Sequence, residues 1–129
     1  MARPKHEHPT PAELEVLQVL WERGSATVRE VMQALGERKR RAYTSVMSLM
    51  NVMCEKALLA REPQGKAFVY SPRVKRDLAL REMVGDLLDR AFEGSASTLV
   101  ARLLEKTSPE ELDEIRRTIE VFDQGKGGR

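Results

Sequence analysis

The first apolar stripe of the chain has helical spacing and a marked beginning and end. Thr10 can cap a helix, Pro11 suits the first helical position, and Glu13 completes a capping box. The apolar side chains that follow continue to Trp21, and Gly24 ends the stripe. These marks predict an amphipathic helix.

Two more helices are predicted after short connectors. Thr27 and Glu30 form a second capping box, and the brief helix that they open ends at Gly36. After the charged turn 37–41, a helical pattern resumes at Ala42. Its apolar face contains Val46, Leu49, Met50, Met53 and Ala57. Its opposite face contains Thr44, Ser45, Ser48 and Asn51.

A predicted β-hairpin follows this third helix. Residues 58–62 favour a strand, 63–66 a turn with proline and glycine, and 67–71 a returning strand that Pro72 ends. The connector 25–28 is also β-capable. The order is therefore helix, short strand, helix, helix, hairpin, which is the order of a winged helix-turn-helix.

The rest of the chain is predicted to be helical. Residues 73–93 carry apolar side chains at helical spacing, and the next helix starts at Ser95 or Ser97. A third capping box begins at Ser108 and opens a helix with apolar residues spaced 3, 4 and 3 apart, as in a helix–helix seam. Residues 123–129 form a polar, glycine-rich end.

The predicted fold class is mainly α, a winged helix-turn-helix DNA-binding domain with a C-terminal helical dimerisation region. Its segments are a flexible N-terminus (1–9), the winged domain (10–72), the dimerisation domain (73–122) and a flexible tail (123–129). The C-terminal helices lack a large core of their own, so a second copy would bury their stripes. Folding back onto the winged domain within a monomer is the alternative. The residues assigned to the dimer interface are Leu80, Val84, Leu87, Leu88, Leu99, Leu103, Leu112, Ile115, Ile119 and Phe122.

Charge is distributed unevenly along the 129 residues. The total is only +2, but residues 1–75 contain 13 Lys or Arg and 8 Asp or Glu, a net +5, and residues 76–129 contain 9 and 12, a net −3. A basic first half joined to an acidic second half indicates a polyanion-binding module attached to another element. An ordinary solvated surface could show the same asymmetry.

The candidate DNA contacts lie where the third helix begins. In a helix-turn-helix, the N-terminal end of the second motif helix meets base edges in the major groove. Arginine suits guanine or phosphate, and short hydroxyl side chains suit phosphate. Met47 could meet a thymine methyl group, and Arg61 and Lys66 flank a wing turn that could lie on the backbone. The full candidate set is Arg38, Lys39, Arg40, Arg41, Tyr43, Thr44, Ser45, Met47, Ser48, Arg61 and Lys66.

The aromatic residues have different expected roles. Trp21 is expected in the core, and Phe68 and Tyr70 are expected to pack under the wing. Tyr43 lies near a helix start, where DNA contact and packing are both open.

Other chemistry finds little support in the sequence. The single cysteine, Cys54, is expected to be a core thiol, with redox sensing as the alternative. The His6-Glu7-His8 run is too isolated for a structural metal site. No catalytic motif is present, so we expect a protein that is not an enzyme and needs no cofactor. The absence of a signal region or an apolar span predicts a cytoplasmic protein without membrane insertion.

These residues resemble a known family. The stretches 11–17, Leu20-Trp21, 28–31, Ala42-Tyr43-Thr44-Ser45-Val46-Met47, 55–59, Gly65 and 70–72 are similar to the penicillinase-repressor family of the BlaI/MecI type. The similarity covers about residues 9–120. It implies a homodimeric repressor of a palindromic operator in double-stranded DNA, with β-lactam resistance genes as the best-known targets.

The resemblance also implies a route of inactivation. In the best-known members a membrane sensor protease triggers cleavage in the C-terminal helices, and the matching segment here is Ala101, Arg102 and Leu103. Two departures stand out: Ala57 replaces a usual glycine, which would alter the approach to the wing, and Val52 replaces a common arginine. With Cys54 alone, the chain lacks the C-terminal cysteine cluster of a copper-responsive branch.

The function predicted from the sequence is therefore a dimeric transcriptional repressor. Two alternatives stay open. One is a winged-helix regulator that responds directly to a small molecule, and the other is a winged-helix protein-interaction module that does not bind DNA.

Overall fold

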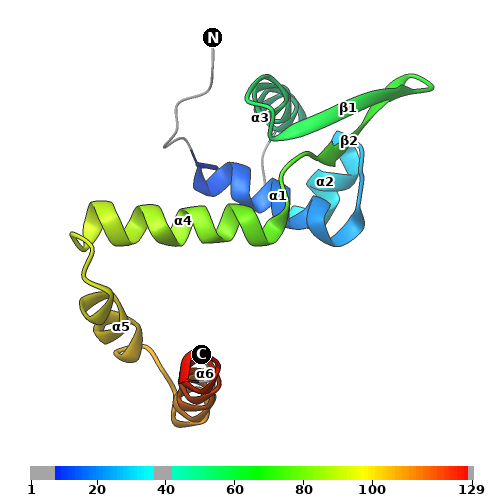
Figure 1. Ribbon diagram of the computed structural model, residues 1–129. Helices are drawn as coiled ribbons and strands as arrows, with labels where there is room; N and C mark the ends of the chain where they lie inside the picture. Colours follow the sequence, from blue (N-terminus) through cyan, green and yellow to red (C-terminus); the bar gives the residue numbers. More distant parts are fainter. Residues whose placement is uncertain (1–7, 37–41, 128–129) are drawn as a thin grey trace. The chain divides into compact units, whose positions relative to one another are not determined.

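The computed structural model describes residues 8–36 and 42–127 (Figure 1). The described residues form α1 (Pro11–Arg23), α2 (Val28–Leu35), α3 (Tyr43–Glu55), β1 (Leu59–Gln64), β2 (Ala67–Pro72), α4 (Arg76–Ala91), α5 (Ala96–Leu104) and α6 (Pro109–Gly127). β1 and β2 pair as an antiparallel hairpin. The mainly helical fold and the winged helix-turn-helix order predicted from the sequence are confirmed.

The predicted capping boxes fix where the first two helices begin. Thr10 Oγ1 accepts from the Glu13 amide at 3.2 Å, and Glu13 Oε1 accepts from the Thr10 amide at 3.0 Å. Thr27 and Glu30 repeat this exchange at 3.2 and 2.9 Å. Each box satisfies amide groups that the first helical turn leaves without partners.

One core holds α1, α2, α3 and the hairpin together. Its buried side chains are Val16, Leu17, Leu20, Ala26, Val28, Val31, Val46, Met50, Met53, Leu58, Leu59 and Tyr70. The predicted apolar face of α3 supplies three of them, and Trp21 packs against the cluster and donates from Nε1 to the carbonyl of Val74 at 2.9 Å. The apolar stripe of α3 therefore holds this helix against the rest of the core.

A buried ion pair joins the start of α1 to the end of α3. The side chain of Glu13 is only 2% exposed, and Lys56 Nζ lies 2.9 Å from its Oε2. Because a buried carboxylate is costly without a partner, this pair fixes the C-terminal end of α3 against α1.

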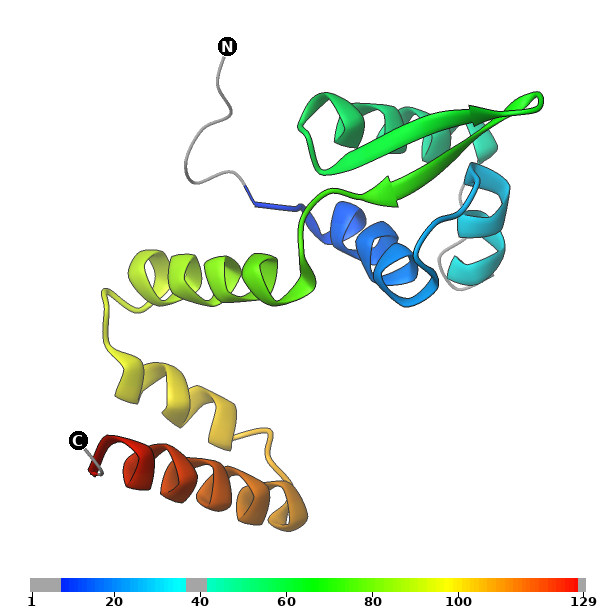
Figure 2. The ribbon, with the colours of Figure 1, turned by 45° about the vertical axis from the view of Figure 1, so that its right-hand side comes forward.

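The hairpin is longer and its turn tighter than the sequence predicts. Pro63 and Gln64 belong to β1, and only Gly65 and Lys66 form the turn, with Gly65 at φ +63°. The loop before α2 pairs with β2 through a single antiparallel bridge, in which Ala26 and Tyr70 exchange backbone hydrogen bonds of 3.0 and 2.8 Å. In both ribbon views β1 runs beside α3 (Figure 2).

The end of α3 shows how the chain tolerates an alanine in place of a glycine. Ala57 has φ +64°, a left-handed conformation that favours glycine. The amide of Leu58 donates to the carbonyl of Met53 at 2.9 Å, and that of Ala57 to Cys54 at 3.0 Å. These two bonds form a Schellman motif. Ala57 thus ends the helix in the conformation that a glycine would favour, with strain at this residue, and an altered approach to the wing stays a prediction.

The chain divides into two compact units within α4, one ending at Val84 and the other starting at Gly85. Ser95 caps α5, and Ser108 Oγ accepts from the Glu111 amide at 3.1 Å at the start of α6. α6 continues to Gly127, although the sequence predicts a tail from residue 123. Extending a formed helix adds a hydrogen bond for each residue, so the polar end continues it at little cost.

Candidate nucleic-acid interface

α3 has one buried face and one face turned to solvent. Val46, Met50 and Met53 are at most 1% exposed. On the other side Thr44, Ser45, Ser48 and Val52 are exposed, as the sequence pattern predicts for the first three. Hydroxyl groups at one-turn spacing along a solvent-facing helix can approach a phosphate or a base edge closely.

An arginine of α2 that the sequence analysis missed lies beside the start of α3. Tyr43 is 41% exposed, and the Arg29 guanidinium of α2 lies 5.3 Å from the centre of its ring. This cation–π contact places an exposed cation beside the N-terminal end of α3. The spacing of fourteen residues between the two partners gave no signal in the sequence.

The other cations predicted at this end belong to the basic run before α3. Arg38, Lys39, Arg40 and Arg41 lie outside the described residues. Met47 is half-buried and packs against the core, so only part of its side chain faces outward.

Residue alternation gives the wing two different faces. The pairs Leu59–Pro72, Arg61–Tyr70 and Pro63–Phe68 alternate with Ala60–Ser71, Glu62–Val69 and Gln64–Ala67. The first set includes both wing side chains that contact Asn51 of α3, which are Arg61 and Tyr70.

A hydrogen-bonded cluster joins the wing to α3. Asn51 Oδ1 accepts from Arg61 Nη1 at 2.7 Å and from Tyr70 Oη at 3.1 Å. The Arg61 guanidinium also lies 4.3 Å from the ring centre of Phe68. Arg61 is exposed but held on two sides, so its charge is presented in a defined place next to α3.

Two predictions about the wing aromatics differ in outcome. Tyr70 packs under the wing at 2% exposure, as predicted. Phe68 is 41% exposed, so the expectation that it packs under the wing is wrong. Its partner is the Arg61 guanidinium and not the core, because β2 extends beyond the helices toward the turn. Lys66, at that turn, is exposed.

Cys54 lies on α3 but is not arranged for thiolate chemistry. The residue is half-buried and packs against the core. Burial raises the pKa of its thiol; Arg61 acts to lower that pKa, and Glu55 acts to raise it. A raised pKa keeps the thiol protonated and less nucleophilic at neutral pH.

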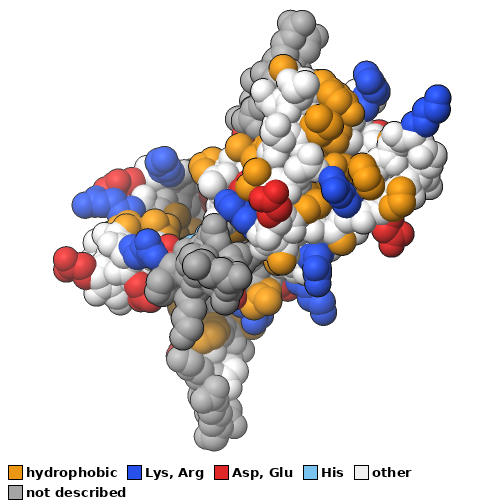
Figure 3. Space-filling view, turned by 90° about the horizontal axis from the view of Figure 1, so that it is seen from above, with side chains coloured by type: hydrophobic (Ala, Val, Ile, Leu, Met, Phe, Trp, Pro, Cys, Tyr) orange, Lys and Arg blue, Asp and Glu red, His pale blue; other side chains and the backbone are white. Residues whose placement is uncertain are grey.

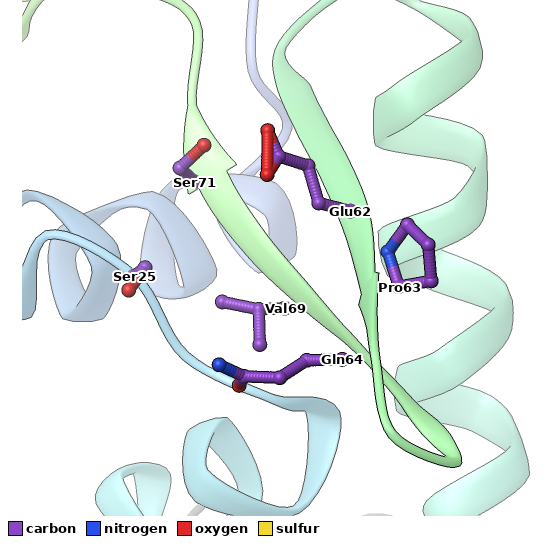
Figure 4. A pocket seen from close by; sticks show the side chains of 6 residues that line it. All are labelled: Ser25, Glu62, Pro63, Gln64, Val69 and Ser71. Carbon is purple, nitrogen blue, oxygen red and sulfur yellow. The ribbon is translucent and has the colours of Figure 1, made fainter.

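An open hollow of about 250 Å³ lies between the wing and the loop before α2 (Figure 4). It is lined by Ser25, Glu62, Pro63, Gln64, Val69 and Ser71. Most of this lining is polar, unlike the mainly apolar pockets that bind small organic ligands. Among the described residues, no three His, Cys, Asp or Glu side chains group closely enough to hold a metal ion.

The surface of the winged unit combines basic and apolar side chains. Figure 3 shows Lys and Arg side chains (blue) interspersed with hydrophobic ones (orange) over this unit, on the right of the view. In the described part of the chain, no helix is both long and apolar enough to cross a membrane.

Comparison with known proteins agrees with this geometry. The family model described as "Penicillinase repressor" matches residues 9–121. The chain belongs to the penicillinase repressor family. A transcriptional regulator named BlaI from Mycobacterium tuberculosis is 31% identical over 119 residues, which are 91% of this chain and 86% of that protein. A penicillinase repressor from Bacillus licheniformis is 26% identical over 117 residues, 89% of this chain and 91% of that one.

Comparison with solved structures supports the fold described above. The YusO protein from Bacillus subtilis matches with a TM-score of 0.54 and 22% identity, over 89% of this chain and 74% of its own. At that identity the likeness shows the winged-helix fold alone. The resemblance seen in the sequence motifs is thus confirmed at the level of the family.

Proposed function

We propose that this chain is a dimeric transcriptional repressor that inserts α3 into the major groove of operator DNA and lays the wing on the adjacent backbone. One observation carries the proposal: the polar, solvent-facing side of α3 lies directly beside an arginine that the wing and α3 hold together. A helix of this kind meets base edges, while neighbouring cations and hydroxyl groups meet phosphates.

The proposed contacts divide by role. Thr44, Ser45 and Ser48 approach the groove, and Tyr43 with Arg29 approaches the backbone at the start of α3. Arg61 and Lys66 contact phosphates beside the groove. The basic run 38–41, which precedes α3, supplies further phosphate contacts. Met47 contributes the outer part of its side chain to a thymine methyl group.

The proposed dimer rests on the exposure of the C-terminal helices. No described residue after Ala79 is buried. Leu103, Ile119 and Phe122 are 56, 58 and 63% exposed, and Val84 and Leu87 are also exposed. The other five residues of the predicted interface, Leu80, Leu88, Leu99, Leu112 and Ile115, are only half-buried. Exposed apolar side chains repeated along these helices are typical of an association surface. We propose that a second copy of the chain covers them.

A dimer of this kind would bind a palindrome. Two recognition helices related by two-fold symmetry reach half-sites about one helical turn of DNA apart, or a multiple of that. The names of two relatives, penicillinase repressor and MecI, the methicillin resistance regulatory protein of Staphylococcus aureus, support β-lactam resistance genes as targets.

Proteolysis is the proposed means of relieving repression, through a membrane sensor protease. The candidate cleavage residues Ala101, Arg102 and Leu103 lie within α5 and are exposed. α5 has nine residues and none of them is buried. A short helix with so little burial opens locally at low cost, which would let a protease bind it in an extended form.

A salt titration tests the DNA-binding claim. The logarithm of the binding constant of the full chain for duplex DNA should fall linearly with the logarithm of the salt concentration, because phosphate contacts release counterions. Lys66→Ala should reduce the slope by about 1, whereas Lys106→Ala, at an exposed lysine in the turn between α5 and α6, should leave it unchanged. Fluorescence anisotropy measures both. Absence of salt-dependent binding would favour a protein-interaction module, and a small molecule that shifts affinity directly would favour a ligand-responsive regulator.

A further inference from the structure

Asn51 lies midway along α3, at the point where the wing touches that helix. It is half-buried, and its Oδ1 accepts two hydrogen bonds from the wing, one from Arg61 Nη1 and one from Tyr70 Oη. Tyr70 is buried, and Arg61 is stacked on Phe68, so both donors are themselves held in place. The amide group of Asn51 is therefore fixed from one side.

The chemistry of arginine decides which way this amide faces. A guanidinium has only N–H donors and no acceptor, so the group that meets Arg61 must be an oxygen. The Tyr70 hydroxyl also fits an oxygen, because it can donate. The Oδ1 of Asn51 consequently points to the wing, and its Nδ2 points elsewhere.

The Nδ2 group of Asn51 has no hydrogen-bond acceptor among the described residues. No described residue has a buried side-chain nitrogen or oxygen that lacks a hydrogen-bond partner. The described residues supply no partner for Nδ2, so this nitrogen must reach solvent. Asn51 lies seven residues after Thr44 and three after Ser48, which places it on the same face of α3.

We propose that Asn51 is a specificity-determining residue that recognises a base edge as a hydrogen-bond donor only. This inference rests on the proposed function of α3 in the major groove. A free asparagine pairs with adenine through both Oδ1 and Nδ2. Here Oδ1 is already occupied by the wing, so only the two Nδ2 hydrogens remain. The base edges that offer them acceptors with no donor beside them are N7 and O6 of guanine and O4 of thymine; adenine offers N7 but places its N6 donor next to it.

Arg61 and Tyr70 act in this arrangement as positioning residues. They orient the amide and fix the distance between the wing and the base that Asn51 contacts. The wing therefore contributes to sequence recognition without touching a base, through the side chain that it holds.

Selection from a library of randomised duplex DNA tests the proposal. The full-length wild type, Asn51→Ala, Asn51→Asp and the control Gln18→Ala, an exposed amide on α1, would each be used for selection at the same salt concentration. The wild type should enrich a site with guanine or thymine at one position of each half-site. Asn51→Ala should lose about tenfold of the discrimination at that position alone, and Gln18→Ala should lose none.

Asn51→Asp separates base recognition from a purely structural role. Aspartate keeps an oxygen for both Arg61 and Tyr70, but it replaces the Nδ2 donors with an acceptor. The preference at that position should therefore switch to a base that donates, which is cytosine through N4 or adenine through N6. This variant also carries the test if Asn51→Ala does not fold, as circular dichroism would show.

The outcomes distinguish the two proposals. If the wild type enriches no sequence, the proposed function fails. If it enriches a site and both Asn51 variants keep the same base preference at every position, the inference about Asn51 is overturned. A loss that is uniform over all positions would overturn it too, because it would show that Asn51 only supports the wing.

Discussion

Two residues of this protein have unusual surroundings, one in its backbone conformation and one in the burial of its thiol. Ala57 adopts a left-handed backbone conformation, and Cys54 keeps a thiol partly removed from water beside both Arg61 and Glu55. Both residues lie at or just after the C-terminal end of α3. Each leads to a prediction that can be measured on the folded chain.

Replacing Ala57 by glycine should stabilise the protein. Glycine adopts φ near +60° without the clash of a Cβ atom, and that clash costs about 1–2 kcal/mol for other residues. Part of this gain is offset by the greater freedom of glycine in the unfolded chain. We expect Ala57→Gly to raise the free energy of unfolding by about 1 kcal/mol in urea denaturation. Ala60→Gly, a control within β1, should lower it.

The thiol of Cys54 should make stability depend on alkaline pH. Burial raises its pKa in the folded state above the ordinary value of 9.0. The unfolded chain therefore loses this proton first, and its contribution to stability is present below pH 9.0 and is lost as the pH rises through the folded pKa. The difference in unfolding free energy between wild type and Cys54→Ala should shrink as the pH rises above 9.0. A difference that stays constant would contradict the raised pKa.

At the scale of elements, the sequence predicts the winged unit well because its signals are local. Capping boxes at Thr10 and Thr27 mark helix starts, and the alternation in 67–71 marks a strand. The predicted turn at 63–66 was too long, because proline usually signals a turn but is also tolerated at a sheet edge.

The part of the site that sequence could not predict depends on contacts between elements. Arg29 and Tyr43 meet across two helices, and Asn51, Arg61 and Tyr70 meet across α3 and both strands. No local pattern specifies such pairs. The exposure of Phe68 was missed for the same reason: alternation gives the face of a strand but not how far the strand extends beyond the core.

At the scale of the whole molecule, the proposed repressor consists of two winged units joined by their C-terminal helices. Only the winged unit has a core of the size that a stable domain needs, because the described residues after Ala79 bury no side chain. In the proposed dimer, the acidic second half of the chain pairs two basic winged units. Operator affinity should consequently depend on association.

A charge placed in the proposed interface should separate the dimer. Ile119→Glu puts a carboxylate into an apolar contact, whereas Gln124→Glu adds the same charge at an exposed polar position of α6. Sedimentation equilibrium should show a dimer for wild type and Gln124→Glu and a shift toward monomer for Ile119→Glu. Affinity for the full operator should fall with it by about tenfold or more, because one half-site is then bound at a time. A wild-type monomer would contradict the proposed dimer.

DNase footprinting of the DNA upstream of the chain's own gene and its neighbours tests the central claim most directly. We expect one protected region with two inverted half-sites, their centres about 10 base pairs or a multiple of that apart, and protection that weakens as salt rises. Protection that follows no inverted repeat, or none at any salt concentration at which the protein remains folded, would contradict it.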